Sequence, residues 1–391
     1  TGNASFGYSG GGNPKNSMVN RIDYSNDTAV TTPVGNLTAN KAYLTGAVSG
    51  QESGLATAFT PITPATRTEG SAGGPAFGYL AGGGDPTRST ISRIDYGNDT
   101  ATPVTKGPMS SSRYGPAGTG NLSYAYFGGG SPLSGNSIVS RTDYSNDTET
   151  GLSKGPLSQA RSMLTAVGNA SYGYFAAGSP TTTTVDRVDY ANDTATAAVK
   201  GPLSVGVSTR RYSGTGNQSY GYFGGSDHPP TSYLNRIDYS NDTSNTSPKG
   251  PLAVTAGARG ANGNSNYGYW GGGHNPSSTG KSHADRVDYS NDSATAVTKG
   301  SLSRSNSGLK STGNADFGYF GGGGDTYVST VDRVDYSNDT PTATAKGPLS
   351  GGRYLLAGVS SRDHGLPSST NIVPATRTEG TAGGPAFGYL A

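Results

Sequence analysis

The sequence contains no cysteine, one tryptophan and only four histidines among its 391 residues. The absence of cysteine excludes disulfides, thiolate metal sites and cysteine nucleophiles, and it leaves the redox compartment open. Only 31% of the residues are apolar. No apolar run approaches the ~20 residues that span a bilayer, so no membrane span is expected. The 28 basic and 26 acidic residues give a formal net charge of +2 without a basic cluster, which argues against nucleic acid as a partner.

What the sequence does contain is a repeat. An aromatic-Gly-Tyr segment, a glycine pair, a variable stretch and the motif Arg-x-Asp-Tyr-x-Asn-Asp recur along the whole chain. The Asp-Tyr pairs of the seven copies are Asp23-Tyr24, Asp95-Tyr96, Asp143-Tyr144, Asp189-Tyr190, Asp238-Tyr239, Asp288-Tyr289 and Asp335-Tyr336. After a first interval of 72 residues, the spacing settles at 46 to 50 residues. Such a period predicts one supersecondary unit copied around a ring or along a stack, each copy burying its apolar face against its neighbours.

Residues 304–351 show the structure of one copy most clearly. Four short runs of β-forming residues predict strands at 304–312, 316–320, 328–336 and 342–346, separated by Gly, Asn, Asp and Pro turn signals. No segment carries a helical period. Four antiparallel strands in each period predict the blade of a β-propeller, so the expected fold class is all-β.

The aromatic-Gly-Tyr strand predicts how neighbouring blades pack. Phe317 and Tyr319 lie on one face of this strand and Gly318 on the other, because strand side chains alternate. We expect the bare glycine to accept an aromatic ring from the next blade. Rings packed in this way would supply most of the buried apolar area in a chain with a mean hydropathy of −0.53.

The order of strands, glycine pairs and turn residues in this repeat resembles that of the kelch repeat. Tyr319-Phe320-Gly321-Gly322 stands for its double glycine, and Val331–Tyr336 stands for its third strand. Gly347-Pro348-Leu349-Ser350, followed by Arg353, stands for its segment between blades. The tryptophan of the kelch fourth strand is missing, and its place falls in the small residues Thr342–Ala345. The resemblance covers almost the whole chain and implies a propeller.

The amino-acid sequence of the repeats, as in Arg-Ile-Asp-Tyr-Ser-Asn-Asp-Thr-Ala and Lys-Gly-Pro-Leu-Ser, is also similar to repeats in structural proteins of marine cyanophages. This resemblance implies a non-enzymatic virion structural protein, in a tail, fibre or other surface part, that mediates host-surface recognition or particle assembly. The implied partners are a host-surface glycan or protein and other subunits of the particle, including further copies of this chain in a homo-oligomer. No catalytic residue, cofactor or metal is expected.

Two alternatives stay open. In the first alternative, the chain is a secreted bacterial adhesin or extracellular filament subunit built from tandem propellers. Its location would then be extracellular instead of the virion. The other is a hydrolase or lyase, for which we find no converging acids or histidines. Because Thr1-Gly2-Asn3 reads as the middle of a repeat, we also expect the sequence to be an excerpt or a processed product.

Counting strands favours a single seven-bladed propeller over residues 1–391. The expected blades are near 1–40, 41–112, 113–160, 161–209, 210–258, 259–303 and 304–352, with a closing strand at 353–360 and an insert with an extra strand at 361–391. The alternative is a six-blade period in a longer tandem chain. Pro64–Ala81 and Pro374–Ala391 differ only at Ser71 and Thr381 and lie 310 residues apart.

The loops between the second and third strands are the candidate recognition rim. They diverge between copies, whereas the Asn-Asp turns are nearly uniform and are explained by local side-chain-to-backbone hydrogen bonds. Drift without function is the competing interpretation of the divergence. The candidate rim residues are Asn13, Lys15, Asp85, Arg88, Ser131, Asp227, His228, His274, Asn275 and Asp325. Asp227, His228 and His274 lie in equivalent loops of successive blades and could share a metal, but they show no ligand-spacing motif.

Overall fold

The computed structural model describes two parts of the chain. The first is residues 77–360 apart from 85–86, 132–135, 205–209, 228–229, 276–279 and 325–326; the second is the backbone of strand segments 6–10, 16–23, 32–41, 47–48 and 389–390. Contacts divide the chain into two compact units, Thr68–Asn371 and Thr1–Arg67 with Ile372–Ala391. Within the described part, no helix is long and apolar enough to cross a membrane.

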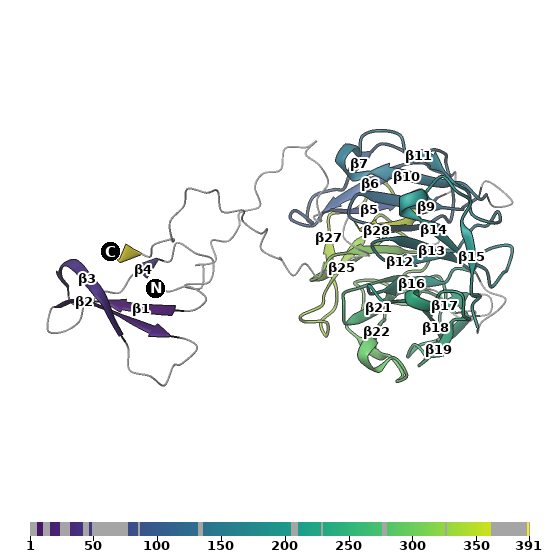
Figure 1. The fold of residues 1–391 in the computed structure, drawn as a ribbon. Coiled ribbons are helices and arrows are strands. Elements are labelled where there is room, and N and C mark those ends of the chain that lie inside the picture. Colours follow the sequence, from purple (N-terminus) through teal and green to yellow (C-terminus); the bar gives the residue numbers. More distant parts are fainter. Residues whose placement is uncertain are drawn as a thin grey trace. The chain divides into compact units, whose positions relative to one another are not determined.

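The larger unit contains six four-stranded antiparallel sheets, the blades of a β-propeller (Figure 1). We number the blades from the first to the sixth in chain order and write each from its first strand to its fourth. The first blade contains β28 (Ala357–Ser360), β5 (Phe77–Ala81), β6 (Ile91–Asp95) and β7 (Val104–Lys106), and the second contains β8 (Ala117–Gly120), β9 (Tyr124–Gly128), β10 (Val139–Asp143) and β11 (Leu152–Lys154). The third contains β12 (Thr165–Gly168), β13 (Tyr172–Ala176), β14 (Val185–Asp189) and β15 (Ala198–Lys200), and the fourth contains β16 (Ser213–Gly216), β17 (Tyr220–Asp227), β18 (Pro230–Asp238) and β19 (Ser247–Lys249). The fifth contains β20 (Gly260–Gly263), β21 (Tyr267–Gly271), β22 (Ala284–Asp288) and β23 (Val297–Lys299), and the sixth contains β24 (Lys310–Gly313), β25 (Phe317–Gly321), β26 (Val331–Asp335) and β27 (Thr344–Lys346). The four strands expected in residues 304–351 are therefore confirmed as β24–β27; β25 has the predicted length, shifted by one residue, and the other three are shorter than predicted.

Closure of the ring shows that the preference for seven blades is wrong. The C-terminal strand β28 pairs with β5, with Val359 opposite Tyr79, and so supplies the first strand of the first blade. In Figure 1 the yellow β28 lies beside the blue β5. The segment 353–360 does close a ring, as expected, but onto β5 and not onto the N-terminal copy, which falls in the smaller unit. Six blades therefore fill one period of 310 residues.

The described strand segments of the smaller unit form two short sheets. β1 (Phe6–Gly10), β2 (Asn16–Asp23) and β3 (Thr32–Lys41) form a three-stranded antiparallel sheet, and β4 (Ala47–Val48) pairs with β29 (Tyr389–Leu390). Where a single propeller was expected over the whole chain, residues 1–40 and 389–390 thus belong to a unit of their own.

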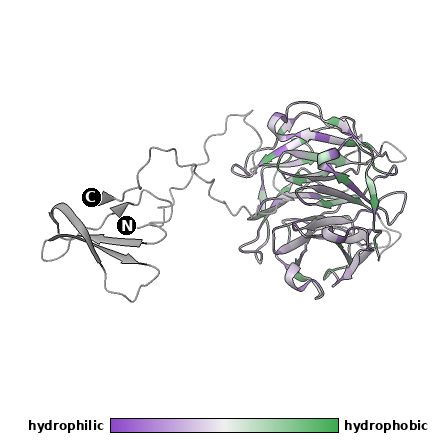
Figure 2. Ribbon diagram, in the orientation of Figure 1, coloured by the Kyte–Doolittle hydropathy of each residue, from purple (hydrophilic) through white to green (hydrophobic). Residues whose placement is uncertain are grey.

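The core of the ring lies between adjacent blades. One buried cluster joins Tyr126 and Val139 of the second blade to Phe175 and Val188 of the third, and similar clusters follow around the ring. In Figure 2 hydrophobic residues alternate with polar ones along the strands instead of forming one continuous region. This pattern is expected when every blade buries its apolar surface against its neighbours.

The glycine of aromatic-Gly-Tyr is required, but for a different neighbour than predicted. A Cβ on Gly221 would meet Val167 of the preceding blade and would lie 2.7 Å from the hydroxyl of Tyr239 and 3.0 Å from Ile237. Tyr239 follows β18 in the same blade, so the expectation of a ring from the next blade is wrong at this position. The next blade's ring reaches a later glycine instead: a Cβ on Gly271 would lie 2.8 Å from Phe320.

The four 3₁₀ turns that follow the third strands share one local cap. They are η1 (Tyr144–Asn146), η2 (Tyr190–Asn192), η3 (Tyr239–Asn241) and η4 (Tyr289–Asn291). In η3 the Asp238 carboxylate accepts a hydrogen bond of 2.9 Å from the Ser240 N–H. The first aspartate of the repeated motif therefore does make the local hydrogen bond that the sequence predicts.

Candidate functional site

The second aspartate of each Asn-Asp turn ties its blade to the preceding one. Asp242 of the fourth blade accepts hydrogen bonds from Tyr174 Oη at 2.9 Å and Arg187 Nη1 at 2.7 Å. Its other carboxylate oxygen lies 3.0 Å from Lys200 Nζ, and its carbonyl accepts a 2.8 Å bond from the Gly201 N–H. All four partners belong to the third blade. We call this arrangement an interblade clamp.

The clamp occurs at all six blade junctions of the ring. The clamp aspartates are Asp99, Asp147, Asp193, Asp242, Asp292 and Asp339. A tyrosine pair stacks beside each clamp, as Tyr174 does on Tyr239 with ring centroids 5.0 Å apart. The uniform sequence of the Asn-Asp turns is therefore explained mainly by contacts between blades. Sequence analysis attributed this uniformity to local turn chemistry alone.

The clamps also fix the charge of these aspartates. Burial alone would raise the pKa of Asp242, but hydrogen bonds from Lys200, Tyr174 and Arg187 outweigh it and hold the pKa below its ordinary value. The same balance lowers the pKa of Asp99, Asp193, Asp292 and Asp339. Each of these carboxylates is therefore ionised at neutral pH, and its oxygens are occupied by a tyrosine, an arginine and a lysine donor.

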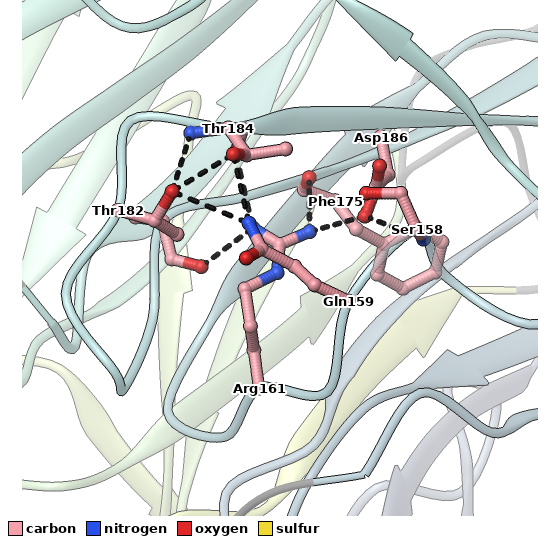
Figure 3. Close-up of polar contacts among 8 residues, drawn as sticks. Ser158, Gln159, Arg161, Phe175, Thr182, Thr184 and Asp186 are labelled. Carbon is pink, nitrogen blue, oxygen red and sulfur yellow. Dashed lines mark hydrogen bonds and ion pairs between the residues drawn. The ribbon is translucent and has the colours of Figure 1, made fainter.

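A second repeated device is an arginine buried beside the first strand. The Arg161 and Asp186 side chains have no exposed surface and form an ion pair of 2.5 Å. Arg161 Nη1 also donates to the carbonyls of Ala177 and Thr184, at 2.8 and 3.0 Å. Figure 3 shows its guanidinium lying between Asp186 on one side and the Thr184 region on the other. In the fifth blade Arg259 and Asp285 repeat the ion pair at 2.7 Å.

The fourth blade departs from this pattern. Asn235 occupies the position that Asp186 and Asp285 occupy in the blades on either side. Arg211 instead pairs with Asp227 at 2.7 Å, and Arg210 Nε lies 3.8 Å from the same carboxylate. β17 and β18 extend beyond their counterparts to carry Asp227 there. Two arginines therefore share one buried carboxylate at the start of the divergent second-to-third loop.

A belt of backbone hydrogen bonds surrounds one end of the ring's central channel. Two residues before each first strand, the backbone is left-handed, with φ between 48° and 66°. The six belt residues are Gly115, Met163, Arg211, Ala258, Gly308 and Leu355. Five N–H···O bonds of 2.7–3.0 Å join neighbours in this belt. Between Arg211 and Ala258 the described residues show no such bond, so the belt is open beside the fourth blade.

The channel itself is lined by the first strands of all six blades, and a cavity of about 60 Å³ lies between them. Lys310 is the charged residue among its described lining residues. The other first strands begin with the small residues Ala117, Thr165, Ser213, Gly260 and Ala357. The pKa of Lys310 is lowered to about 8, mainly by burial and also by the charge of Arg211, while the charge of Asp227 acts in the opposite direction.

Tyrosines lie on the other side of the channel mouth. Tyr114 and Tyr354 each stand directly before a belt residue, and their hydroxyls are 3.2 Å apart. Their rings meet edge to face at 5.4 Å, and Tyr327 lies 5.0 Å from Tyr354. Burial raises the pKa of Tyr354, whereas the charge of Arg211 acts in the opposite direction. We call Tyr114, Arg211, Asp227, Lys310 and Tyr354 the mouth cluster.

Three of the predicted rim residues prove to be structurally equivalent. Ser131, Asp227 and His274 each form backbone hydrogen bonds with the residue before a belt position, respectively Tyr114, Arg210 and Gly257. Ser131 and Asp227 are buried, with 7% and 5% of their surface exposed. His274 is partly buried.

The remaining rim residues are divided between described and undescribed positions. Arg88 is exposed at the start of the third-strand region of the first blade, and Asn275 is partly buried after His274. Asn13, Lys15, Asp85, His228 and Asp325 lie outside the described residues. Among the positions that the structure does describe, no three His, Cys, Asp or Glu side chains gather as metal ligands would. A metal shared by Asp227, His228 and His274 stays a prediction.

Sequence reasoning missed Lys310, Arg211, Tyr114 and Tyr354. The available signal was departure from the repeat. Among the equivalent positions of the six blades, Lys310 stands with small residues, and Asn235 stands with three aspartates and two serines. Asn235 could have been found from the sequence, because it directly precedes the arginine of the repeated Arg-x-Asp-Tyr motif. The position of Lys310 could be compared between blades only once the first strands and their register were known.

No family model matches the chain, and no curated protein matches it. In fold it is similar to YjhT. The solved structure titled "Structure of YjhT" is 12% identical, has a TM-score of 0.53, and the match covers 64% of this chain and 88% of that one. At this identity the similarity to YjhT shows the propeller fold alone. The kelch-like and phage-like resemblances stay predictions.

Proposed function

We propose that this chain is a non-enzymatic structural protein of a virus particle, in a tail, fibre or other surface part, whose propeller binds a host-surface glycan. The observation that supports this proposal is where the blades differ. They are nearly identical at the interblade clamps and diverge at the channel mouth, where the mouth cluster lies. On a uniform scaffold, divergent positions that surround an open cavity are typical of recognition.

A glycan suits the chemistry of the mouth cluster. Tyr114 and Tyr354 present aromatic surface with hydroxyl groups attached, which suits the apolar faces and hydroxyls of a sugar ring. Arg211 and Lys310 add charged donors, whose hydrogen bonds are stronger than neutral ones. Lys310 stands on a first strand, and the backbone hydrogen bonds of the belt hold the segments that carry the other three groups, so binding requires little ordering of the protein.

A glycan array tests the proposal. We expect the chain to bind a subset of envelope glycans, Tyr354→Ala to lose that binding, and Leu152→Ala to keep it. Leu152 is a suitable control because it is 58% exposed on the outer strand β11. Glycan binding that survives Tyr354→Ala, or no binding at all, contradicts the recognition part. Absence of the chain from purified particles by mass spectrometry contradicts the virion part.

A second candidate function, a filament built from tandem propellers, is favoured by the smaller unit. β4 and β29 pair with Val48 opposite Tyr389, and the ring closes with Val359 opposite Tyr79. The two pairs have the same register: Val359 follows Val48 by 311 residues, and Tyr389 follows Tyr79 by 310. β4 and β29 therefore carry the two halves of a ring closure, which two copies or two repeats could complete between them.

Engineered cysteines test the filament, because the chain has none of its own. We expect Val48→Cys combined with Tyr389→Cys to form disulfide-linked multimers that lengthen with protein concentration. The single variant Val48→Cys is the control and should stop at dimers. A double variant that forms only an intramolecular disulfide at every concentration contradicts the filament.

A further inference from the structure

Lys310 is an unusual lysine for this protein. The lysines that end the fourth strands each face a clamp aspartate, as Lys200 faces Asp242 at 3.0 Å. Lys310 instead opens a first strand inside the channel, and none of the carboxylates in the described residues lies within 4 Å of it. A partly buried cation with no anionic partner is costly, so its presence indicates an anion that arrives from solution.

The charges around Lys310 also favour an anion. Arg211 and Asp227 are the groups whose charges act on it, and Arg210 lies beside them. These three cationic side chains face a single carboxylate, which Arg211 already binds at 2.7 Å. The described part of the mouth therefore carries an excess of positive charge.

The belt leaves a donor at the same place. Five belt residues donate their N–H group to the preceding belt carbonyl, but the N–H of Ala258 makes no hydrogen bond among the described residues. Ala258 is 2% exposed and follows Arg211 in the belt. A buried N–H without a partner is rare in folded proteins, and a bound acid group would satisfy it.

Aromatic surface completes the mouth. Tyr354 and Tyr114 come from the first and second blades, and Tyr327, which is 38% exposed, extends their surface outward. A free inorganic ion would have no use for this surface. A sugar ring would pack on it while an attached carboxylate reached the cations.

From this geometry we propose that the channel mouth binds an acidic saccharide, with the sugar's carboxylate on Lys310 and Arg211 and its ring against Tyr354 and Tyr114. The inference rests on the proposed glycan recognition and specifies its ligand class. Every group involved stands on a first strand, in the belt or directly before a belt residue.

Calorimetric titration of the full chain tests this assignment at about pH 7. The probe is trigalacturonic acid, and the matched neutral sugar is galactotriose. We expect only the acidic sugar to bind, and Lys310→Met to weaken it by about 10- to 100-fold, the loss typical of one hydrogen bond to a charged group. Lys281→Met is the control, because Lys281 is a partly buried lysine on the third-strand side of the fifth blade, outside the channel lining. Lys310→Arg should retain binding.

The pH dependence gives a second readout. Anion binding needs the protonated lysine, whose pKa is lowered to about 8, so affinity should fall as the pH rises from about 7 to about 9. Lys310→Arg should remove this fall. If Lys310→Met does not fold, as judged by its unfolding transition, Lys310→Gln and the pH profile provide the same comparison.

The outcomes separate the ligand class from the proposed function. Equal binding of both trisaccharides, or an unchanged affinity in Lys310→Met, overturns the acidic ligand while glycan recognition stands. Acetate that competes as strongly as trigalacturonic acid overturns the sugar contact with the tyrosines. If neither trisaccharide binds and the glycan array is also empty, both proposals are wrong.

Discussion

The interblade clamps and the channel mouth share one repeated backbone but use it differently. At the clamps all six junctions carry the same aspartate with tyrosine, arginine and lysine partners from the preceding blade. At the mouth the belt backbone is repeated, yet the side chains on it range from glycine to Arg211 and Leu355. Positions that hold the ring together cannot vary without loss of stability, whereas those facing the channel can. In this fold, repetition marks the contacts that hold the ring together, and departure from the repeat marks the positions at which we propose recognition.

Acid should break the clamps together and so have the largest effect. The pKa values of Asp99, Asp193, Asp242, Asp292 and Asp339 lie below the ordinary 3.8, so their contribution to stability is present above that pH and is lost as the pH falls through the lowered values. Asp332, whose pKa burial raises, acts in the opposite sense. Urea unfolding between about pH 7 and about pH 3 should show stability falling steeply below about pH 4. A flat profile across this range would show that the clamps contribute little.

Removal of one clamp should cost less than acid but more than any change at the mouth. Asp242→Ala leaves Arg187 and Lys200 without their partner and should lower the free energy of unfolding by about 2–4 kcal/mol, near the range for breaking a mostly buried pair. Asp238→Ala in the same turn removes only the local cap and should cost about 1 kcal/mol or less. Equal losses in the two variants, measured by denaturant unfolding, would contradict the clamp.

Gly221→Val tests the packing next to the clamps. The added methyl groups would collide with Val167 and the Tyr239 hydroxyl, and overpacking of this kind costs about 1–3 kcal/mol. Because each blade touches its neighbours, we expect a broader unfolding transition for the whole ring. Gly351→Ala is the matched control, since nothing lies within 4 Å of the Cβ that it adds. If Gly221→Val is as stable as the wild type, the close packing of Gly221 against Val167 and Tyr239 is wrong.

The smallest effect is expected for an exposed residue among the divergent loops. Arg88→Ala should change the free energy of unfolding by less than about 0.5 kcal/mol, as surface substitutions usually do. The charge of Arg88 acts unfavourably on Arg353, so a slight stabilisation is the expected sign. A loss as large as that of Asp242→Ala would remove the distinction between clamp and loop.

Much of one blade could be predicted from its own residues. The strands at Phe317–Gly321 and Val331–Asp335 follow from alternation and turn signals, which are local properties of the chain. The local cap by Asp238 was also predictable, because an aspartate two residues before an N–H makes the same contact in any turn. The partner of Asp242 was not, because Tyr174 and Arg187 belong to another blade.

By itself, the sequence determined the period, the four strands of each blade and the propeller class, since these depend on spacing and on neighbours along the chain. Only the tertiary structure decided that the ring has six blades, because closure depends on which first strand reaches Phe77–Ala81, and Ala357–Ser360 does. It likewise decided the candidate site. Lys310, Arg211 and Tyr354 come from three different blades, and the charge of Arg211 acts on the other two only because the ring has closed around one channel.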